Sequence, residues 1–198
     1  MNKQELEKIK QEALQEHIPI IMDDTLAVVK EILEQKKPKS ILEIGTAVGY
    51  SAICFSEFLT EDGFIDTIER EKERIEEAKR NVKRAEVEDK IHLYEGDAVE
   101  ILPTLNKTYD VVFIDASKGK YPFFLEQALR MLKENGVILA DNVLYKGYVR
   151  SSYNKHKQRT AVRNLREYLQ KVEENPSLKT TVLEVGDGLA ISQKKEQK

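Results

Sequence analysis

The chain of 198 residues is predicted to fold as one α/β domain, with helices on both faces of a mostly parallel sheet of seven strands. Three observations predict this class. Strand-like segments alternate with helical segments from residue 40 to residue 140, as in right-handed βαβ units. The segments 111–114 and 137–140 are unbroken apolar runs, typical of strands covered on both faces. The strands 180–185 and 189–192 are joined by two glycines as a hairpin, so the last strand is predicted to be antiparallel.

Two helices are predicted before the first strand. The apolar positions of 2–16 and 22–36 recur at helical spacing, and residues 17–21 are typical of an extended connector. The elements expected after them are a strand at 40–44, a helix at about 50–59, a strand at 64–69, a helix at 71–86, a strand at 91–95, a short helix at about 98–104, a strand ending at 115, a helix at about 121–133, a strand ending at 141, a helix at 157–174 and the hairpin. The polar tail 193–198 is predicted to fray.

The composition indicates a soluble, cytoplasmic protein. The single Cys54 excludes an internal disulfide, and its apolar neighbours favour a core residue over a nucleophile. No signal peptide is visible at the charged N-terminus, and no apolar run approaches the roughly 20 residues that cross a bilayer. The three histidines, His17, His92 and His156, are too scattered to form a catalytic or metal-binding group. We therefore expect no membrane partner and no soft-metal site.

The net charge of -3 does not indicate a nucleic-acid-binding protein, but the distribution of charge is uneven. The segment 146–171 contains one acid, Glu167, and tyrosines at 145, 148 and 153 lie among its basic residues. Two interpretations remain open: a solvated helix face, or a surface whose cations contact phosphates while the tyrosines stack on bases. The basic residues are Lys146, Arg150, Lys155, Lys157, Arg159, Arg163, Arg166 and Lys171.

Acidic and amide side chains follow the two apolar strands. Asp115 comes directly after the first, and Asp141 and Asn142 follow the second. Open α/β sheets bind ligands at the carboxyl ends of their strands, and carboxylate and amide oxygens suit Mg²⁺ or Ca²⁺. The alternative is that turns simply favour Asp and Asn. Both segments together favour a hard-metal site.

A glycine loop follows the first strand. Gly45 and Gly49 lie four residues apart after Glu43, which matches neither the dinucleotide pattern nor a phosphate loop. Such a loop suits a nucleoside ligand without a pyrophosphate. Glu69 ends the second strand about twenty residues past the loop, where an acid accepts hydrogen bonds from ribose hydroxyls. A solvated carboxylate at the strand end is the alternative for Glu69.

Taken together, these residues resemble the metal-dependent class I O-methyltransferases, the family of the catechol and caffeoyl-CoA O-methyltransferases. The fold of that family is Rossmann-like, and the terminal hairpin fits it as well. The resemblance spans residues 43–142. It is carried by Glu43-x-Gly45-x-x-x-Gly49-Tyr50-Ser51, Glu69, Gly96-Asp97-Ala98, Asp115-x-x-Lys118 and Asp141-Asn142.

The resemblance implies that S-adenosylmethionine binds over the glycine loop. Glu69 would contact the ribose and Gly96, Asp97 and Ala98 the adenine, while Ser51 and the connector near Met22 would lie by the methionine part. The N-terminal helices, residues 1–37, would lie over the active site. Asp115 would serve both the cofactor and the metal. The implied cofactor-binding set is Met22, Glu43, Gly45, Gly49, Tyr50, Ser51, Glu69, Gly96, Asp97, Ala98 and Asp115.

The resemblance also implies the chemistry. Asp115, Asp141 and Asn142 would hold Mg²⁺, which orients two adjacent substrate oxygens and acidifies a hydroxyl. Lys118 stands where the family has its catalytic lysine, so Lys118 and Asp115 are the predicted catalytic residues. The competing interpretation of Lys118 is a solvent-facing turn residue.

Within the family, the chain is most similar to the bacterial tRNA 5-hydroxyuridine methyltransferases, which would make the tRNA anticodon loop its partner. Lys146, Arg150, Lys155, Lys157, Arg159 and Arg163 would then bind RNA. A small catechol-like or phenolic acceptor would need the same catalytic residues and remains the nearest alternative. A non-catalytic RNA-binding protein and a dehydrogenase are further alternatives, the last disfavoured by the missing dinucleotide glycines. The family also suggests a homodimer.

Overall fold

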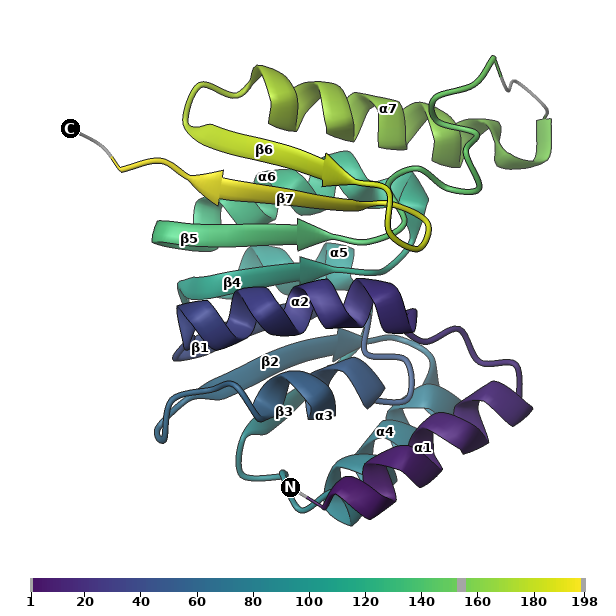
Figure 1. Ribbon diagram of the computed structural model, residues 1–198, viewed down its shortest axis with the longest axis vertical. Helices are drawn as coiled ribbons and strands as arrows, with labels where there is room; N and C mark the ends of the chain where they lie inside the picture. The colour runs from purple at the N-terminus through teal and green to yellow at the C-terminus, as the bar shows by residue number, and fades with distance from the viewer. Residues whose placement is uncertain (1, 153–155, 197–198) are drawn as a thin grey trace. The chain divides into compact units, whose positions relative to one another are not determined.

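The computed structural model describes residues 2–152 and 156–196, apart from the side chain of Lys157. The chain divides into two compact units, Met1–Leu105 and Asn106–Lys198. Each unit has its own strands, helices and buried apolar residues (Figure 1).

Three parallel strands form the sheet of the first unit. They are β1 (Ser40–Ile44), β2 (Phe64–Glu69) and β3 (Ile91–Glu95), in the order β3-β2-β1. The register pairs Glu43 with Thr67 and Thr67 with Leu93. The helices of this unit are α1 (Lys3–Gln15), α2 (Asp23–Lys36), α3 (Tyr50–Ser56), α4 (Lys72–Arg84) and α5 (Ala98–Ile101), with the 3₁₀ turn η1 (Leu102–Thr104).

The N-terminal helix α1 is fastened to α4 and packs against α3 (Figure 1). The guanidinium of Arg84 contacts the carboxylates of Glu5 (3.0 Å) and Glu12 (2.6 Å), both on α1. The backbone amide of Asn2 donates to Ala85 O at 3.0 Å. Ile9 is 1% exposed, so this helix is amphipathic, as its spacing predicted.

The second unit contains both parallel and antiparallel strands. β4 (Tyr109–Ile114) and β5 (Leu132–Ala140) are parallel, and β7 (Leu189–Lys194) is antiparallel to both β5 and β6 (Leu178–Leu183), in the order β4-β5-β7-β6. Its helices are η2 (Lys118–Lys120), α6 (Tyr121–Met131), η3 (His156–Gln158) and α7 (Arg159–Glu174). Figure 1 shows α7 alongside β6. The described residues thus supply seven strands, and the predicted α/β class with an antiparallel C-terminal hairpin is confirmed.

Several predicted boundaries were wrong, and two of them have a clear physical reason. The helix expected at 50–59 ends at Ser56, because the chain turns there and the amide of Thr60 bonds to Pro38 O at 3.1 Å. The tail expected to fray from Gln193 begins later, since Gln193 pairs with Val137 and the strand continues to Lys194. The ammonium of Lys194 contacts Glu134 at 2.6 Å, which helps to hold the strand end.

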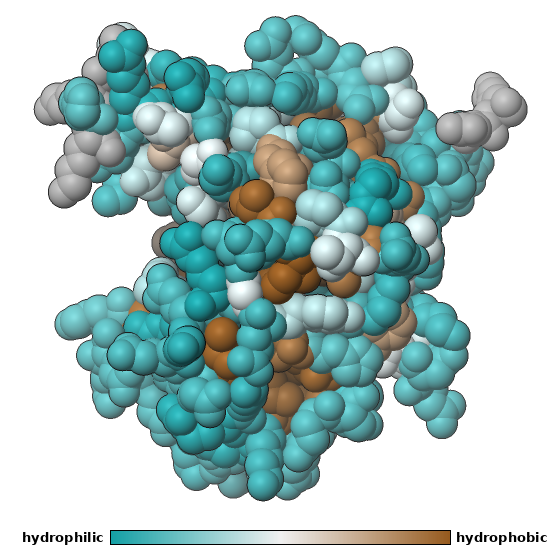
Figure 2. All heavy atoms as spheres, turned by 180° about the vertical axis from the view of Figure 1, so that it is seen from behind, coloured by the Kyte–Doolittle hydropathy of each residue, from teal (hydrophilic) through white to brown (hydrophobic). Residues whose placement is uncertain are grey.

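Hydrophilic residues cover most of the face drawn in Figure 2, and hydrophobic residues show in separate areas between them. Cys54 is 1% exposed, and burial raises the pKa of its thiol to about 11, which confirms it as a core residue. The large hydrophobic side chains exposed in the described part of the chain are Leu14 and Met22, at 48% and 52%. None of the helices described is long and apolar enough to span a bilayer.

Candidate functional site

The glycine loop of the first unit has left-handed backbone at three positions. φ is +104° at Gly45, +46° at Ala47 and +82° at Gly49. Glycine adopts such angles without strain, whereas alanine does so at a cost and is held there by its surroundings. An added Cβ at Gly49 would stand 3.5 Å from the Ala78 side chain, so α3 starts close against α4. The loop is therefore tightly folded between β1 and α3.

Glu69 at the end of β2 is fixed by three backbone amides. Its Oε2 accepts from Ala47 N at 2.8 Å, and its Oε1 accepts from Arg70 N at 2.9 Å and Glu71 N at 3.0 Å. A carboxylate has about four lone-pair sites, so about one remains for an outside donor. The hydrogen bond from Ala47 N also connects Glu69 directly to the glycine loop. Glu69 and the loop are therefore close enough to contact the same ligand.

Glu43 is a fully buried acid inside the same loop region. Its carboxylate accepts hydrogen bonds from Ser51 Oγ and Thr67 Oγ1, both at 2.5 Å. Thr67 in turn pairs with Thr46 at 2.6 Å. Glu43 therefore orients Ser51 and the loop through these hydrogen bonds. A direct contact of Glu43 with a ligand stays a prediction.

The remaining predicted cofactor residues of this unit lie at helix starts. Asp97 caps α5 by accepting from Val99 N at 2.8 Å, between Gly96, with φ +144°, and Ala98. Tyr50 begins α3 and is 6% exposed, and burial raises the pKa of its hydroxyl. A ligand contact of Tyr50 would thus use its backbone. Met22 precedes α2 with an exposed side chain.

In the second unit, the structure brings Asp115, Asp141 and Asn142 to one edge of the sheet. Ile114 and Ala140 are paired residues of the parallel strands β4 and β5, and the acids follow them directly. The amide of Asp141 donates to Ile114 O at 2.9 Å, and Asn142 N donates to Asp141 Oδ1 at 2.7 Å. Asp141 is 1% exposed and its Oδ2 has no hydrogen-bond partner within the described residues.

The electrostatics of these acids favour a bound cation. Burial, together with the charge of Asp115, raises the pKa of Asp141 to about 7. Burial likewise raises the pKa of Asp115, although the Lys118 ammonium opposes the shift. A buried carboxylate oxygen without a donor is costly. Two carboxylates and an amide oxygen are hard ligands, so this set fits Mg²⁺. No cluster of three or more His, Cys, Asp or Glu side chains occurs in the described residues to offer a richer site.

Lys118 lies in the turn η2 and reaches the same place. Its Nζ donates to Asn142 Oδ1 at 2.7 Å and stands 5.6 Å from the centre of the Tyr145 ring. Tyr145 in turn packs edge-on against Tyr148, with ring centres 5.9 Å apart. The side chain is part-buried, so the interpretation of Lys118 as a solvent-facing turn residue does not fit.

The basic side chains described in the segment are all exposed, and they differ in their partners. Arg150 pairs with Glu184, and Lys171 pairs with Glu167. Arg166 donates to three backbone carbonyls, those of 148, 149 and 151. Lys155 lies outside the described residues, as does the side chain of Lys157. The side chains of Lys146, Arg159 and Arg163 are exposed.

Three positioning residues escaped the sequence analysis. Asn164 on α7 donates to Gly119 O within the Lys118 turn. Arg166 holds the chain after Tyr148, and Asp187 accepts from the chain after Asn142. Their partners are mainly backbone groups far away in the sequence. Such contacts leave no local motif, so the sequence alone does not predict them.

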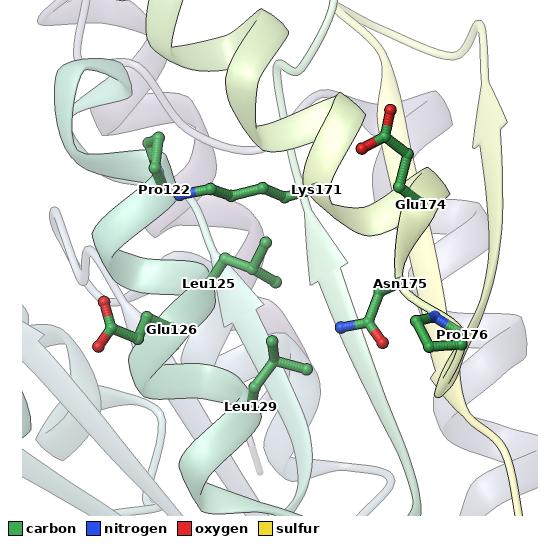
Figure 3. Close-up of a pocket in the computed structure, with 8 residues that line it drawn as sticks. All are labelled: Pro122, Leu125, Glu126, Leu129, Lys171, Glu174, Asn175 and Pro176. Carbon is green, nitrogen blue, oxygen red and sulfur yellow. The ribbon is translucent and has the colours of Figure 1, made fainter.

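A groove of about 530 Å³ lies elsewhere in the second unit, between α6 and the end of α7 (Figure 3). Leu125 and Leu129 line one side and Lys171 and Glu174 the other. None of the predicted cofactor, metal or catalytic residues lines it. The groove therefore takes no part in the site.

Comparison with known proteins agrees with the fold. The family model described as O-methyltransferase matches residues 2–195. A catechol O-methyltransferase from Niastella koreensis is 32% identical over 163 residues, covering 78% of this chain and 72% of that protein. A caffeoyl-CoA O-methyltransferase from Medicago sativa is 31% identical over 170 residues, covering 81% and 68%. The crystal structure of an O-methyltransferase from Bacillus cereus with bound SAH superposes with a TM-score of 0.88 at 26% identity, covering 98% of this chain and 92% of that one.

The Rossmann-like α/β fold, with its antiparallel C-terminal strands, is the fold of the class I O-methyltransferases to which the chain is structurally similar. The chain belongs to the O-methyltransferase family, and it is an S-adenosylmethionine-dependent O-methyltransferase of the catechol and caffeoyl-CoA type.

Proposed function

We propose that the protein transfers a methyl group from S-adenosylmethionine to the 5-hydroxyl of wobble 5-hydroxyuridine in tRNA, with Mg²⁺ as the metal. The observation that carries the catalytic part is the buried, unpartnered Oδ2 of Asp141. It lies beside Asn142, whose side-chain oxygen is already paired with Lys118.

The first unit supplies the cofactor-binding residues of this proposal. The remaining lone pair of the Glu69 carboxylate accepts a hydrogen bond from a ribose hydroxyl. The loop from Gly45 to Ser51 binds the rest of the nucleoside and the methionine part. Asp97 and Ala98 recognise the adenine. Because the loop is fixed by Glu43 and Glu69 before any ligand arrives, little ordering accompanies binding.

The second unit supplies the residues that activate the acceptor. Asp115, Asp141 and Asn142 would hold Mg²⁺, which supplies a Lewis acid that acidifies and orients the acceptor hydroxyl. In the transfer, the acceptor oxygen forms a bond to the methyl carbon while the carbon–sulfur bond breaks. Lys118 is the proposed general base, whose Nζ takes the acceptor's proton. Its bond to Asn142 and its contact with Tyr145 keep Nζ in place for this task.

Lys118→Ala tests the catalytic assignment. Removing a general base lowers kcat by about 10²- to 10⁴-fold. The affinity for S-adenosylhomocysteine, measured by calorimetry, stays unchanged because Asn142 and Tyr145, which Lys118 contacts, are not among the predicted cofactor-binding residues. Lys120→Ala, in the same turn, serves as the matched control. Equal losses of turnover and cofactor affinity would refute the assignment.

The exposed cations support an RNA acceptor. Lys146, Arg159 and Arg163 would contact phosphates, and Tyr145 offers a flat ring beside Lys118 on which a base could stack. The O4 and 5-hydroxyl oxygens of 5-hydroxyuridine form an adjacent pair, as the metal requires. If phosphates dominate binding, affinity for tRNA falls steeply as salt rises.

Mass spectrometry of tRNA nucleosides from cells with and without the protein decides the substrate. Loss of 5-methoxyuridine with accumulation of 5-hydroxyuridine would establish it. The second candidate is a small catechol-like acceptor, which the names of the relatives favour. Reversing the charges of Arg159 and Arg163 would abolish methylation of tRNA and spare that of a catechol.

A further inference from the structure

We propose that the Asp187–Gly188 turn of the C-terminal hairpin is a positioning element for the metal ligand Asn142. This inference rests on the metal site of the proposed function. Asp187 lies about 45 positions after Asn142 in the sequence. Asn164 and its partner Gly119, in the Lys118 turn, are separated by a similar distance along the chain.

The loop that carries Asn142 has an unusual backbone. Asn142, Tyr145, Lys146 and Gly147 have φ values of +57°, +41°, +57° and +72°. For residues with a Cβ, the left-handed region costs roughly 1–2 kcal/mol each. Such a loop persists only where its surroundings hold it. An outside anchor is therefore required.

The hairpin turn is that anchor. Four consecutive amides of the loop donate to two residues of the turn. Val143 N bonds to Gly188 O at 3.0 Å, and Leu144 N and Tyr145 N bond to Asp187 O at 2.9 and 3.2 Å. Lys146 N bonds to the Asp187 carboxylate at 3.2 Å. The loop begins directly after Asn142, so these bonds set where that residue stands.

The turn also holds the loop by close packing. Gly188 has φ +92°, and a Cβ built on it would lie 2.4 Å from Leu144 Cγ and 2.8 Å from its Cβ. Only glycine leaves room for Leu144, which is 8% exposed. Leu144 cannot move without shifting the chain two residues after Asn142.

The position of Asn142 affects both the predicted metal site and the predicted base, Lys118. Asn142 Oδ1 is at once a predicted ligand and the acceptor for Lys118 Nζ. Mg²⁺ demands near-ideal geometry at 2.0–2.1 Å, so a small displacement of one ligand weakens binding. Groups that orient a ligand typically contribute about 10- to 100-fold to metal affinity.

Binding of Mn²⁺, followed by electron paramagnetic resonance of the free ion, tests this inference on the full-length protein. In Gly188→Ala the new Cβ displaces Leu144, and we expect Mn²⁺ affinity to fall by about 10- to 100-fold. The affinity for S-adenosylhomocysteine stays as it was. Adding Leu144→Ala removes the 2.4 Å contact with Cγ but keeps the 2.8 Å contact with Cβ, so it recovers only part of the lost Mn²⁺ affinity.

Gly136→Ala is the matched control, because its Cβ would stand 2.7 Å from Leu132 Cδ1 in the same unit, in the middle of β5 and outside the loop that carries Asn142. It lowers thermal stability and leaves Mn²⁺ affinity within about twofold, as for a distant site.

If Gly188→Ala fails to fold, Asp187→Ala weakens Mn²⁺ binding by removing the acceptor for the backbone amide of Lys146, and Asp187→Asn restores it. Unchanged Mn²⁺ affinity in folded Gly188→Ala, or an equal loss in Gly136→Ala, would overturn the inference. A wild-type protein that binds no Mn²⁺ would instead overturn the proposed metal site itself.

Discussion

The substitution Asp141→Asn should stabilise the metal-free protein at alkaline pH, although it removes a buried acid from the site. In the folded chain, the pKa of Asp141 is raised to about 7 from an ordinary value of 3.8, by burial and by the charge of Asp115. The unfolded chain therefore loses this proton at lower pH than the folded chain does. The stability of the wild-type protein falls as pH rises from about 4 to about 7 and stays low above that.

The magnitude follows from the shift. About three pKa units correspond to about 4 kcal/mol of destabilisation by the ionised carboxylate at pH 8. Asparagine keeps Oδ1 for Asn142 N but places an amide donor at the unpartnered Oδ2 position, which costs about 1–3 kcal/mol. The difference leaves the variant more stable by about 1–3 kcal/mol at pH 8. At pH 5 the wild-type penalty is only about 1.5 kcal/mol, so the two proteins are nearly equal.

Thermal unfolding in the presence of a chelator measures this effect at pH 5 and pH 8. At pH 8 we expect the variant to melt about 2–10 °C above the wild type, and at pH 5 the two should melt together. Adding Mg²⁺ at pH 8 should then raise the Tm of the wild type more than that of the variant. A variant that is less stable than the wild type at pH 8, or a difference that does not depend on pH, would refute the reasoning.

Two further predictions concern cofactor and RNA. Glu69→Gln replaces one acceptor oxygen by a donor that faces backbone amides, so calorimetry should show S-adenosylhomocysteine affinity reduced by about 10- to 100-fold with Mn²⁺ affinity unchanged. Unaltered cofactor affinity would contradict the ribose assignment. Arg163→Gln should weaken tRNA binding and lower the slope of its salt dependence by about one, whereas Arg166→Gln should chiefly lower the Tm, because Arg166 is bonded to backbone carbonyls. Equal salt slopes for the two variants would argue against the division of the basic segment.

Much of the fold was predictable because it is written in local pattern. The apolar runs before Asp115 and Asp141 are the strands β4 and β5, and the two glycines around Asp187 mark the turn between β6 and β7. The site was predictable as far as strand ends reveal it, since parallel neighbours place Asp115 and Asp141 at one edge. Element ends were less predictable, because contacts from elsewhere decide them. For example, Pro38 O accepts a hydrogen bond from the amide of Thr60, in the segment that follows α3.

The division of the basic segment shows the same limit. Sequence alone presents Arg150, Arg163 and Arg166 as equivalent cations. The fold places Glu184 beside Arg150 and three backbone carbonyls around Arg166, whereas Arg163 bonds to its chain neighbour Asn164 at 3.3 Å. Charge patterning records how many cations a segment has and not which partners they meet.

By itself, the sequence determined the α/β class, and it predicted the glycine loop with its acid Glu69 and the hard-ligand set Asp115, Asp141 and Asn142, because each depends on periodicity or on short spacing along the chain. Only the tertiary structure decided that Asp141 Oδ2 is buried without a donor, that Lys118 bonds to Asn142, and that the Asp187–Gly188 turn holds the ligand loop. These last features join residues 24 to about 45 positions apart through burial and backbone hydrogen bonds, and such contacts exist only once the chain has folded.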